Sequence, residues 1–158
     1  AMSISDRILL LNAGIMGPEH QDVAQISADE VATLFLTNAV APIRLARQLA
    51  HRLRAGGVIA CMSSQMGSVA LARSAEMPLY GASKAALNSM INSFYGPLEI
   101  PGLTVLAMHP GWVKTDMGGE GAEIDVATST RGMVEQVKAN SGRGGLYFIN
   151  YKGEPLIW

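Results

Sequence analysis

Continuous apolar runs alternate along this chain with longer segments of helical periodicity. The apolar runs cover residues 7–15 (RILLLNAGI), 56–64 (GGVIACMSS), 103–111 (LTVLAMHPG) and 145–150 (GLYFIN). Runs without polar alternation are typical of strands buried on both faces of a sheet. Helical patterns separate them: from a capping box at residues 27–30 to about Arg54, from Tyr80 to just before Pro97, and over residues 124–139. This alternation predicts an α/β fold with helices on both faces of a parallel sheet.

The composition is that of one soluble globular domain spanning residues 1–158. Hydrophobic residues make up 49% of the chain and charged residues 16%, with a formal net charge of −1. This balance, without a basic block, argues against a nucleic-acid or anionic-membrane surface. A single cysteine, Cys61, excludes an internal disulfide and a cysteine-rich metal site. Because no apolar run reaches membrane-spanning length and no signal peptide opens the chain, we expect a cytoplasmic protein.

Polar residues follow three of the predicted strands. In parallel sheets of this kind, ligands bind beyond the carboxyl ends of the strands. The polar residues are Asn12-Ala13-Gly14 after the first strand, Ser63 and Ser64 at the end of the second, and His109, Pro110, Gly111 and Thr115 around the end of the third. We therefore expect three strand ends to converge on one site. His109 has a competing explanation, since a His-Pro pair at a strand end more often has a structural role.

Tyr80 and Lys84, in the stretch PLYGASK, are four residues apart and share one face of a predicted helix. A tyrosine near its unperturbed pKa of about 10 exchanges protons poorly at neutral pH. A cation within about 4–6 Å favours the phenolate, so we expect Lys84 to lower the pKa of Tyr80. The pair predicts a general acid/base, although the spacing alone is common among surface tyrosines beside solvated lysines.

Ser64 ends a predicted strand, so its hydroxyl can reach the same crevice and donate a hydrogen bond to a substrate oxygen. The alternative is that the hydroxyl satisfies the backbone of its own loop.

Asn38 occupies a core-facing position on the predicted helix that begins at Ser27. The apolar stripe of that helix consists of Val31, Leu34, Phe35, Leu45 and Leu49, and position 38 continues it. Pro42 follows four residues later and has no N–H to donate to the carbonyl of Asn38. The carbonyl is therefore expected to be free at a local kink, where it could hold an ordered water. A kinked helix with a satisfied core asparagine explains the same residues equally well.

Four stretches together resemble the short-chain dehydrogenase/reductase family. They are LNAG at 11–14, Asn38 in TNAVAP, MSSQMG with Ser64, and YGASK; HPGWVKTDMGG at 109–119 adds a Pro-Gly-x-Val-x-Thr pattern. Their order and spacing match over essentially the whole chain. The 109–119 stretch and the ending GLYFINYKGEPLIW are most similar to the C-factor/sniffer-type carbonyl reductase branch.

The resemblance implies an NADP- or NAD-dependent oxidoreductase that transfers hydride between a nicotinamide and a small carbonyl or alcohol substrate. It also implies a catalytic tetrad of Asn38, Ser64, Tyr80 and Lys84. In this tetrad Tyr80 donates the proton, Ser64 stabilises the oxyanion and Lys84 binds the nicotinamide ribose. The carbonyl of Asn38 anchors a relay water. Cofactor contacts are implied for Asn12, Ala13, Gly14, Tyr80, Lys84, Pro110, Gly111, Val113 and Thr115. No metal ligand set is expected.

The family's glycine-rich G-x-x-x-G-x-G turn has no counterpart before Arg7. The resemblance thus implies that the chain holds strands four to seven of the family order, a truncated Rossmann-like domain. At roughly 30 residues per βαβ unit, on the order of 70 residues would precede it, with the adenosine and pyrophosphate half of the cofactor site. The run 7–15 would then be an apolar sheet edge, covered by a preceding segment or by self-association.

Two classes of function remain open from the sequence. One is the catalytic half of a carbonyl reductase or alcohol dehydrogenase. The other is a non-enzymatic binding or signalling fragment that retains the fold without binding cofactor. A homodimer or higher homo-oligomer through helices at about 28–54 and 80–94 is implied by the resemblance in either case. Halohydrin dehalogenases share the scaffold but carry arginine where Lys84 stands, which argues against them.

Overall fold

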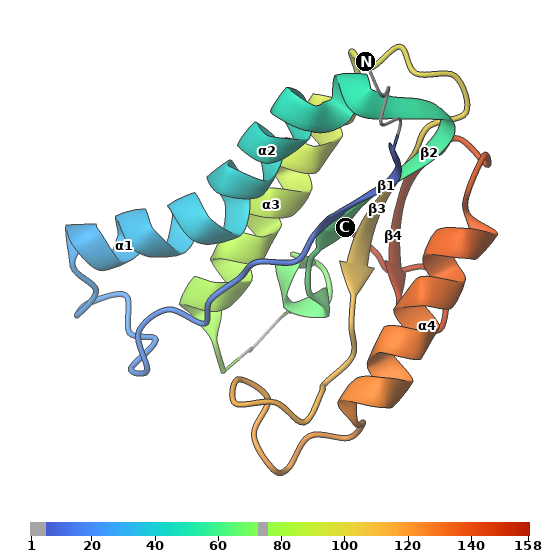
Figure 1. Ribbon diagram of the computed structural model, residues 1–158. Coiled ribbons are helices and arrows are strands. Elements are labelled where there is room, and N and C mark those ends of the chain that lie inside the picture. The colour runs from blue at the N-terminus through green and yellow to red at the C-terminus, as the bar shows by residue number, and fades with distance from the viewer. Residues whose placement is uncertain (1–5, 73–75) are drawn as a thin grey trace.

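The computed structural model describes residues 6–72 and 76–158, and it contains a parallel four-stranded sheet with helices on both faces (Figure 1). The strands are β1 (Asp6–Leu11), β2 (Leu53–Met62), β3 (Thr104–His109) and β4 (Gly145–Asn150), paired in the order β1-β2-β3-β4. The helices are α1 (Ala28–Phe35), α2 (Ala41–Leu49), α3 (Pro78–Tyr95) and α4 (Val126–Ala139). All three strand pairs are parallel, so the predicted α/β class is confirmed.

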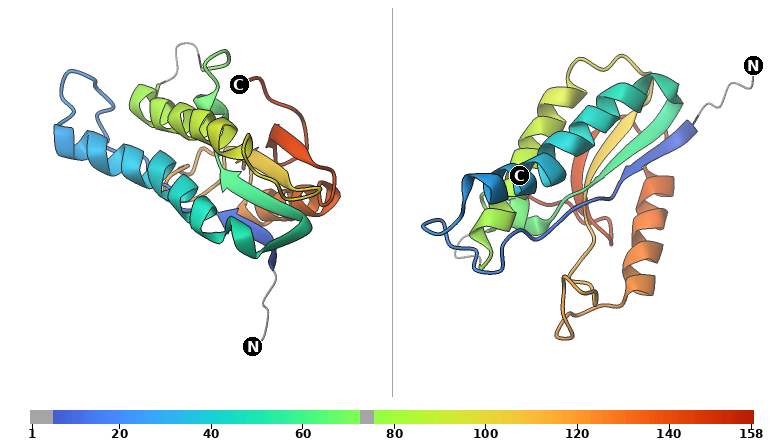
Figure 2. Two further views of the ribbon diagram at one scale, coloured as in Figure 1. Left: turned by 90° about the horizontal axis from the view of Figure 1, so that it is seen from above. Right: turned by 60° about the vertical axis from the view of Figure 1, so that its left-hand side comes forward.

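Alternate residues of the central strands enter two separate hydrophobic cores. Ile59 and Val105 belong to the core that α2 and α3 cover, whereas Val58 and Leu106 belong to the core that α4 covers. Figure 2 shows α2 and α3 side by side on one face of the sheet. Each of these four side chains has no exposed surface, and burying one stabilises the fold by about 1.5–3 kcal/mol. The continuous apolar runs of β2 and β3 are explained by these two covered faces.

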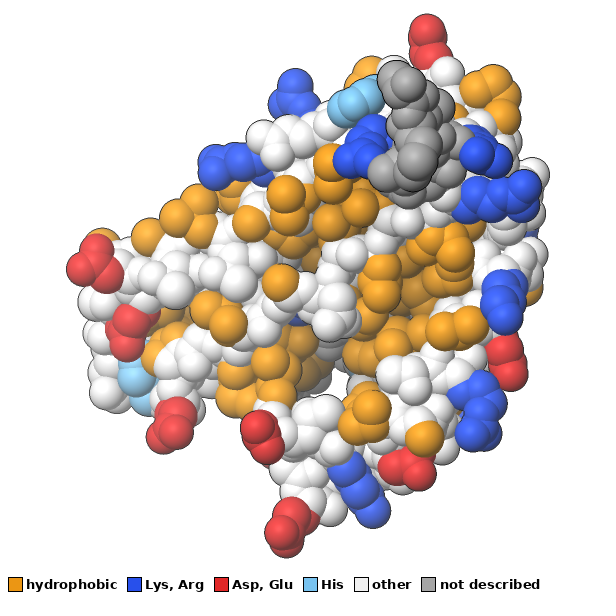
Figure 3. Space-filling model, viewed as in Figure 1, with side chains coloured by type: hydrophobic (Ala, Val, Ile, Leu, Met, Phe, Trp, Pro, Cys, Tyr) orange, Lys and Arg blue, Asp and Glu red, His pale blue; other side chains and the backbone are white. Residues whose placement is uncertain are grey.

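Strand β1 differs from the sequence expectation because only one of its faces is covered. Leu11 is 8% exposed and joins the core under α2, but Ile8 and Leu10 are 52% and 54% exposed. β1 lies at the edge of the sheet, as expected from the sequence. The prediction that it is buried on both faces was wrong for this chain, because the face that carries Ile8 and Leu10 is exposed. Figure 3 shows hydrophobic side chains gathered in the middle of the face that Figure 1 presents.

The segment from α1 to α2 contains a π-helical turn, η1 (Leu36–Val40), in which the Ala41 N–H donates to Leu36 O. A π turn inserts one extra residue into a helix, and the buried face therefore shifts by one position after it. Leu45, predicted to face the core, is 46% exposed, and Ala46 is fully buried in its place. The interruption near Pro42 takes this form, with Pro42 in the first turn of α2 where a missing N–H is tolerated.

Two short 3₁₀ turns complete the connections that matter for the site. η2 (Ala50–Arg52) ends the predicted long helix before β2 begins, and η3 (Gln65–Gly67) follows β2 directly. Residues 12–15, 63–64 and 110–111, which end the apolar runs of the sequence, lie just beyond the strand ends. These loop residues are the ones that the sequence singled out for binding.

Candidate active site

Ser64 and Tyr80 lie next to each other at the carboxyl end of β2. Ser64 caps η3, where its Oγ accepts a hydrogen bond from the Met66 N–H at 3.1 Å. Tyr80 lies in the first turn of α3, with its phenol close enough to the Ser64 side chain for that hydroxyl to lower the pKa of the phenol. The structure therefore unites two members of the predicted tetrad, and it also shows the loop-capping role that was the alternative for Ser64.

The helix and the turn that carry these two residues meet backbone to backbone. A Cβ at Gly81 would lie 2.9 Å from Met66 O, and a Cβ at Gly67 would lie 2.8 Å from the carbonyl carbon of Lys84. Contacts this short leave no room for a side chain, so the two glycines set how closely α3 approaches the Ser64 turn. The placement of the Tyr80 phenol beside Ser64 depends on that approach.

Lys84 lies one helical turn after Tyr80, and its Nζ is 5.8 Å from the centroid of the Tyr80 ring. The residue is 2% exposed, and its Nζ donates to Met62 O at 2.8 Å. Burial lowers the pKa of Lys84 to about 8. The ammonium group is thus held beside the ring by a carbonyl at the end of β2.

The pKa of Tyr80 moves in the direction opposite to the sequence expectation. Burial raises it above the ordinary value of 10.0, and the neighbouring Ser64 hydroxyl lowers it by a smaller amount. The expectation that Lys84 would lower this pKa was wrong because desolvation of the phenolate dominates. In the structure Tyr80 is a protonated phenol at neutral pH.

Asn38 is fully buried and uses its side chain to join three elements. Its Nδ2 donates to Ile15 O at 2.7 Å and to Ser83 Oγ at 2.9 Å, and its Oδ1 accepts from the Ile15 N–H at 2.8 Å. The side chain therefore ties the loop after β1 to α3, the helix that carries Tyr80 and Lys84. This is the satisfied core asparagine that the sequence left open.

Gly14 brings the loop after β1 against the Lys84 ammonium group and the Asn38 side chain. A Cβ at this position would lie 3.2 Å from Lys84 Nζ and 3.5 Å from Asn38 Oδ1. The absence of a side chain at Gly14 therefore allows the loop to approach the ammonium group this closely. Asn12 and Ala13, just before it, are exposed.

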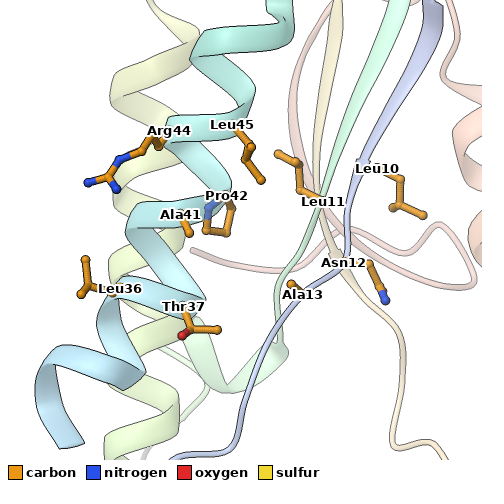
Figure 4. Close-up of a pocket in the computed structure, with 10 residues that line it drawn as sticks. All are labelled: Leu10, Leu11, Asn12, Ala13, Leu36, Thr37, Ala41, Pro42, Arg44 and Leu45. Carbon is orange, nitrogen blue, oxygen red and sulfur yellow. The ribbon is translucent and has the colours of Figure 1, made fainter. Parts of the chain in front are cut away.

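A cleft of about 480 Å³ opens next to this loop, between the end of β1 and the helical segment from η1 to α2 (Figure 4). Its lining includes Asn12, Ala13, Thr37 and Pro42. The volume falls within the range of small-molecule sites, about 300–1,000 Å³.

The loop after β3 lies at the neighbouring strand end and has contacts of its own. Pro110 O accepts a hydrogen bond from Ser129 Oγ at 2.6 Å, and Val113 forms an isolated bridge with Ile124. The exposed Thr115 accepts the Gly118 N–H at 3.1 Å, so its hydroxyl closes a turn within the loop. Gly111 adopts a positive φ of 87°. The predicted nicotinamide contacts of this loop remain predictions.

His109 ends β3 on the face that α3 covers, because Val105 and Ala107, which alternate with it, belong to that core. Burial lowers its pKa to about 4, so the ring is neutral at pH 7. Among the described residues, its buried Nδ1 has no hydrogen-bond partner.

Sequence reasoning missed two polar residues that support the site. Asn88 is 5% exposed and accepts a 2.6 Å hydrogen bond from Ser63 Oγ, next to Ser64. Its position eight residues after Tyr80 places it on the same helical face, a signal that could have revealed it. Gln21 accepts the Tyr80 N–H at 3.0 Å, and no sequence pattern indicated this contact across 59 residues.

A family model described as short chain dehydrogenase matches residues 7–125. The chain belongs to the short-chain dehydrogenase family. The parallel sheet and the sequence order of the predicted tetrad agree with this membership, and the family expectation is confirmed.

Individual relatives place the chain near the carbonyl reductases. It is 32% identical over 153 residues to C-signal of Myxococcus xanthus, covering 96% of this chain and 92% of that protein. It is 51% identical, with a TM-score of 0.91, to a carbonyl reductase from Pseudomonas aeruginosa PAO1 in complex with NADP. It is 32% identical, with a TM-score of 0.82, to carbonyl reductase Sniffer of D. melanogaster. Both alignments cover 99% of this chain and 68% of the solved chain.

These relatives differ in how much of their own length this chain covers. The chain spans nearly all of C-signal but only 53% and 48% of two further curated oxidoreductase relatives.

Two negative findings concern the part of the chain that the structure describes. Within residues 6–72 and 76–158, no helix has the length and apolar character needed to cross a bilayer. The same residues contain no group of three or more His, Cys, Asp or Glu side chains arranged to hold a metal ion.

Proposed function

We propose that this chain carries the catalytic site of an NADP- or NAD-dependent carbonyl reductase, with Tyr80 as the proton donor. The observation that carries the proposal is the placement of the Tyr80 phenol beside the Ser64 side chain, with the Lys84 ammonium 5.8 Å from the centroid of the phenol ring. All three groups lie at the carboxyl edge of the sheet, where ligands of such folds bind.

The residues present fit the nicotinamide half of the cofactor. Gly14 lets the loop after β1 approach Lys84 closely, and an ammonium group that already donates to Met62 O has further N–H groups to offer ribose hydroxyls. The exposed Asn12 and Ala13 border the adjacent cleft. When bound, the nicotinamide supplies or accepts the hydride.

Tyr80 holds the proton that the reduction needs. Because burial raises its pKa, the phenol is protonated at neutral pH and can donate to the oxygen of a carbonyl substrate as negative charge develops there. Ser64, next to that phenol, can turn its hydroxyl toward the same oxygen and stabilise the charge.

Lys84 can act as a proton source for this step. A lysine with a pKa of about 8 releases a proton readily near neutral pH, so it can pass one back to Tyr80. The relay water at the main-chain carbonyl of Asn38 is part of this proposal.

Titration of the purified chain with NADPH and with NADH, followed by nicotinamide fluorescence, tests cofactor binding. Turnover of carbonyl substrates is then followed by loss of nicotinamide absorbance. Y80F should reduce turnover at least roughly a hundredfold and leave cofactor binding within about twofold. Y95F, on the same helix, is the matched control and should turn over like the wild type. Turnover retained in Y80F would refute the proton-donor role, and a wild-type chain that binds neither cofactor would favour the non-enzymatic alternative.

We also propose that the chain forms a homodimer through the helices at about 28–54 and 80–94. Leu36 and Leu45 are 49% and 46% exposed on the first of these segments, which leaves apolar surface for a partner helix to cover. Light scattering of the wild type should give twice the mass of 16.7 kDa. A monomer at micromolar concentration would contradict this proposal.

A further inference from the structure

Gln21 connects the loop after β1 to the catalytic helix. Its side chain is buried, with 8% of the residue exposed, and it makes three hydrogen bonds. Nε2 donates to Met16 O at 3.1 Å and to Pro18 O at 3.0 Å, which fixes the orientation of the amide. Oε1 then accepts the backbone N–H of Tyr80 at 3.0 Å. Each hydrogen-bonding atom of the side chain is thus engaged.

Helix α3 needs such a partner because its own N-cap residue supplies none. Met77 is the N-cap, and it makes no side-chain capping hydrogen bond. Pro78 has no N–H, and the first hydrogen bond back to the cap runs from Gly81 N–H to Met77 O at 2.9 Å. Tyr80 is the third residue of the helix, the position whose N–H an N-cap side chain normally satisfies. Gln21 performs that role from 59 residues away.

The backbone at Gln21 is also unusual. Its φ is 48°, and within residues 6–72 and 76–158 it is the one non-glycine residue with a positive φ. Left-handed backbone is disfavoured for a glutamine, and such residues persist where surrounding contacts hold them, often at functional sites. Here the contacts that hold it include the hydrogen bond to Tyr80.

We infer that Gln21 is a positioning residue for Tyr80: a remote N-cap that holds the first turn of α3, and with it the phenol, against Ser64. This inference rests on the proposed function for its catalytic meaning, but the cap itself can be tested without turnover. Gln21 does not touch the reacting atoms in this scheme. It acts through the backbone of Tyr80.

Amide hydrogen exchange measured by NMR on the full chain tests the cap. Two variants remove the side chain: Q21A keeps the positive φ on a residue with a Cβ, whereas Q21G relieves it. Both should speed exchange at the Tyr80 N–H roughly tenfold, the effect of losing an N-cap. The Ile91 N–H, deep in the same helix, should exchange as in the wild type. Q25A, an exposed glutamine in the same loop, is the matched control.

The titration of the Tyr80 phenol provides a second test. With tyrosines labelled at Cζ, Tyr80 of the wild type should titrate above 10, and Q21A and Q21G should both bring its midpoint down toward 10 as the first turn loosens and water reaches the ring. In a chain that turns over, both variants should lower kcat with the KM for NADPH unchanged.

Three results would overturn the inference. One is a Tyr80 N–H as protected in Q21A and Q21G as in the wild type. Another is equal acceleration at Ile91, which would mark a general loss of stability instead of a local cap. The third is an unchanged Tyr80 titration in both variants. An inactive wild type would count against the reductase proposal, and the exchange and titration results would still decide the role of Gln21.

Discussion

The side-chain amide of Asn38 bonds both backbone polar groups of Ile15: Nδ2 donates to the Ile15 carbonyl at 2.7 Å, and Oδ1 accepts from the Ile15 N–H at 2.8 Å. A third hydrogen bond runs from Nδ2 to Ser83 Oγ at 2.9 Å. A buried amide thus substitutes for a strand partner where the loop after β1 leaves the sheet. The residue that the family resemblance assigns to proton relay also has this structural role.

The first prediction concerns that pairing. N38A removes three hydrogen bonds and leaves the backbone N–H and C=O of Ile15 without these partners, so it should lower the free energy of unfolding by about 2–4 kcal/mol. Urea denaturation followed by circular dichroism measures the change. N92A, at an exposed position of α3, should stay within about 0.5 kcal/mol of the wild type. Equal stability of N38A and the wild type would show that the loop finds other partners.

The second prediction concerns Pro42. P42A supplies an N–H that can bond the carbonyl of Asn38, four residues earlier, and so remove the acceptor proposed for the relay water. Turnover should fall roughly tenfold, less than the 10²–10⁴ of a complete general-acid contribution. The comparison is P97A, which lies at an exposed position after α3. An unchanged rate in P42A would remove the main-chain carbonyl of Asn38 from the mechanism.

The third prediction is a rise in stability between pH 8 and pH 9. The pKa of Lys84 is about 8 in the fold against 10.5 ordinarily, so in this range the unfolded chain binds more protons than the native one. The free energy of unfolding therefore increases with pH, by about 1 kcal/mol over the interval. Above pH 9 the buried thiol of Cys61, whose pKa is raised to about 12, acts in the opposite direction because the native state then retains the proton.

Denaturant midpoints at pH 8.0, 8.5 and 9.0 measure this rise, and K84M should abolish it. A slope that persists in K84M would assign the effect to another group.

The fourth prediction concerns acid. Burial gives His109 a pKa of about 4 against an ordinary 6.5, so between these pH values the unfolded chain binds a proton that the native state does not bind. Stability should therefore fall as the pH drops, by about 2 kcal/mol between pH 6.5 and pH 4.5 from this residue. H109Q should show a shallower loss over the same interval. H51Q, at an exposed position, should follow the wild type, and identical pH profiles for all three proteins would exclude His109 as the cause.

The elements of the fold could be predicted from the sequence because they depend on local patterns. The apolar runs that became β2 and β3 are continuous because two cores cover the two faces of those strands. The i, i+4 spacing of Tyr80 and Lys84 places both on one face of α3 whatever surrounds the helix. The order of Asn38, Ser64, Tyr80 and Lys84 along the chain likewise identified the family without any coordinates.

Three features were decided only by the tertiary structure, since each depends on what lies nearby in space. The π turn shifted the buried face of α2 from Leu45 to Ala46, a change of phase that a regular helical period does not reveal. The pKa of Tyr80 rises because the folded chain desolvates the phenol more than its neighbours stabilise the phenolate. The N-cap of α3 comes from Gln21, a contact between residues 59 positions apart that exists only once the loop after β1 lies against the helix.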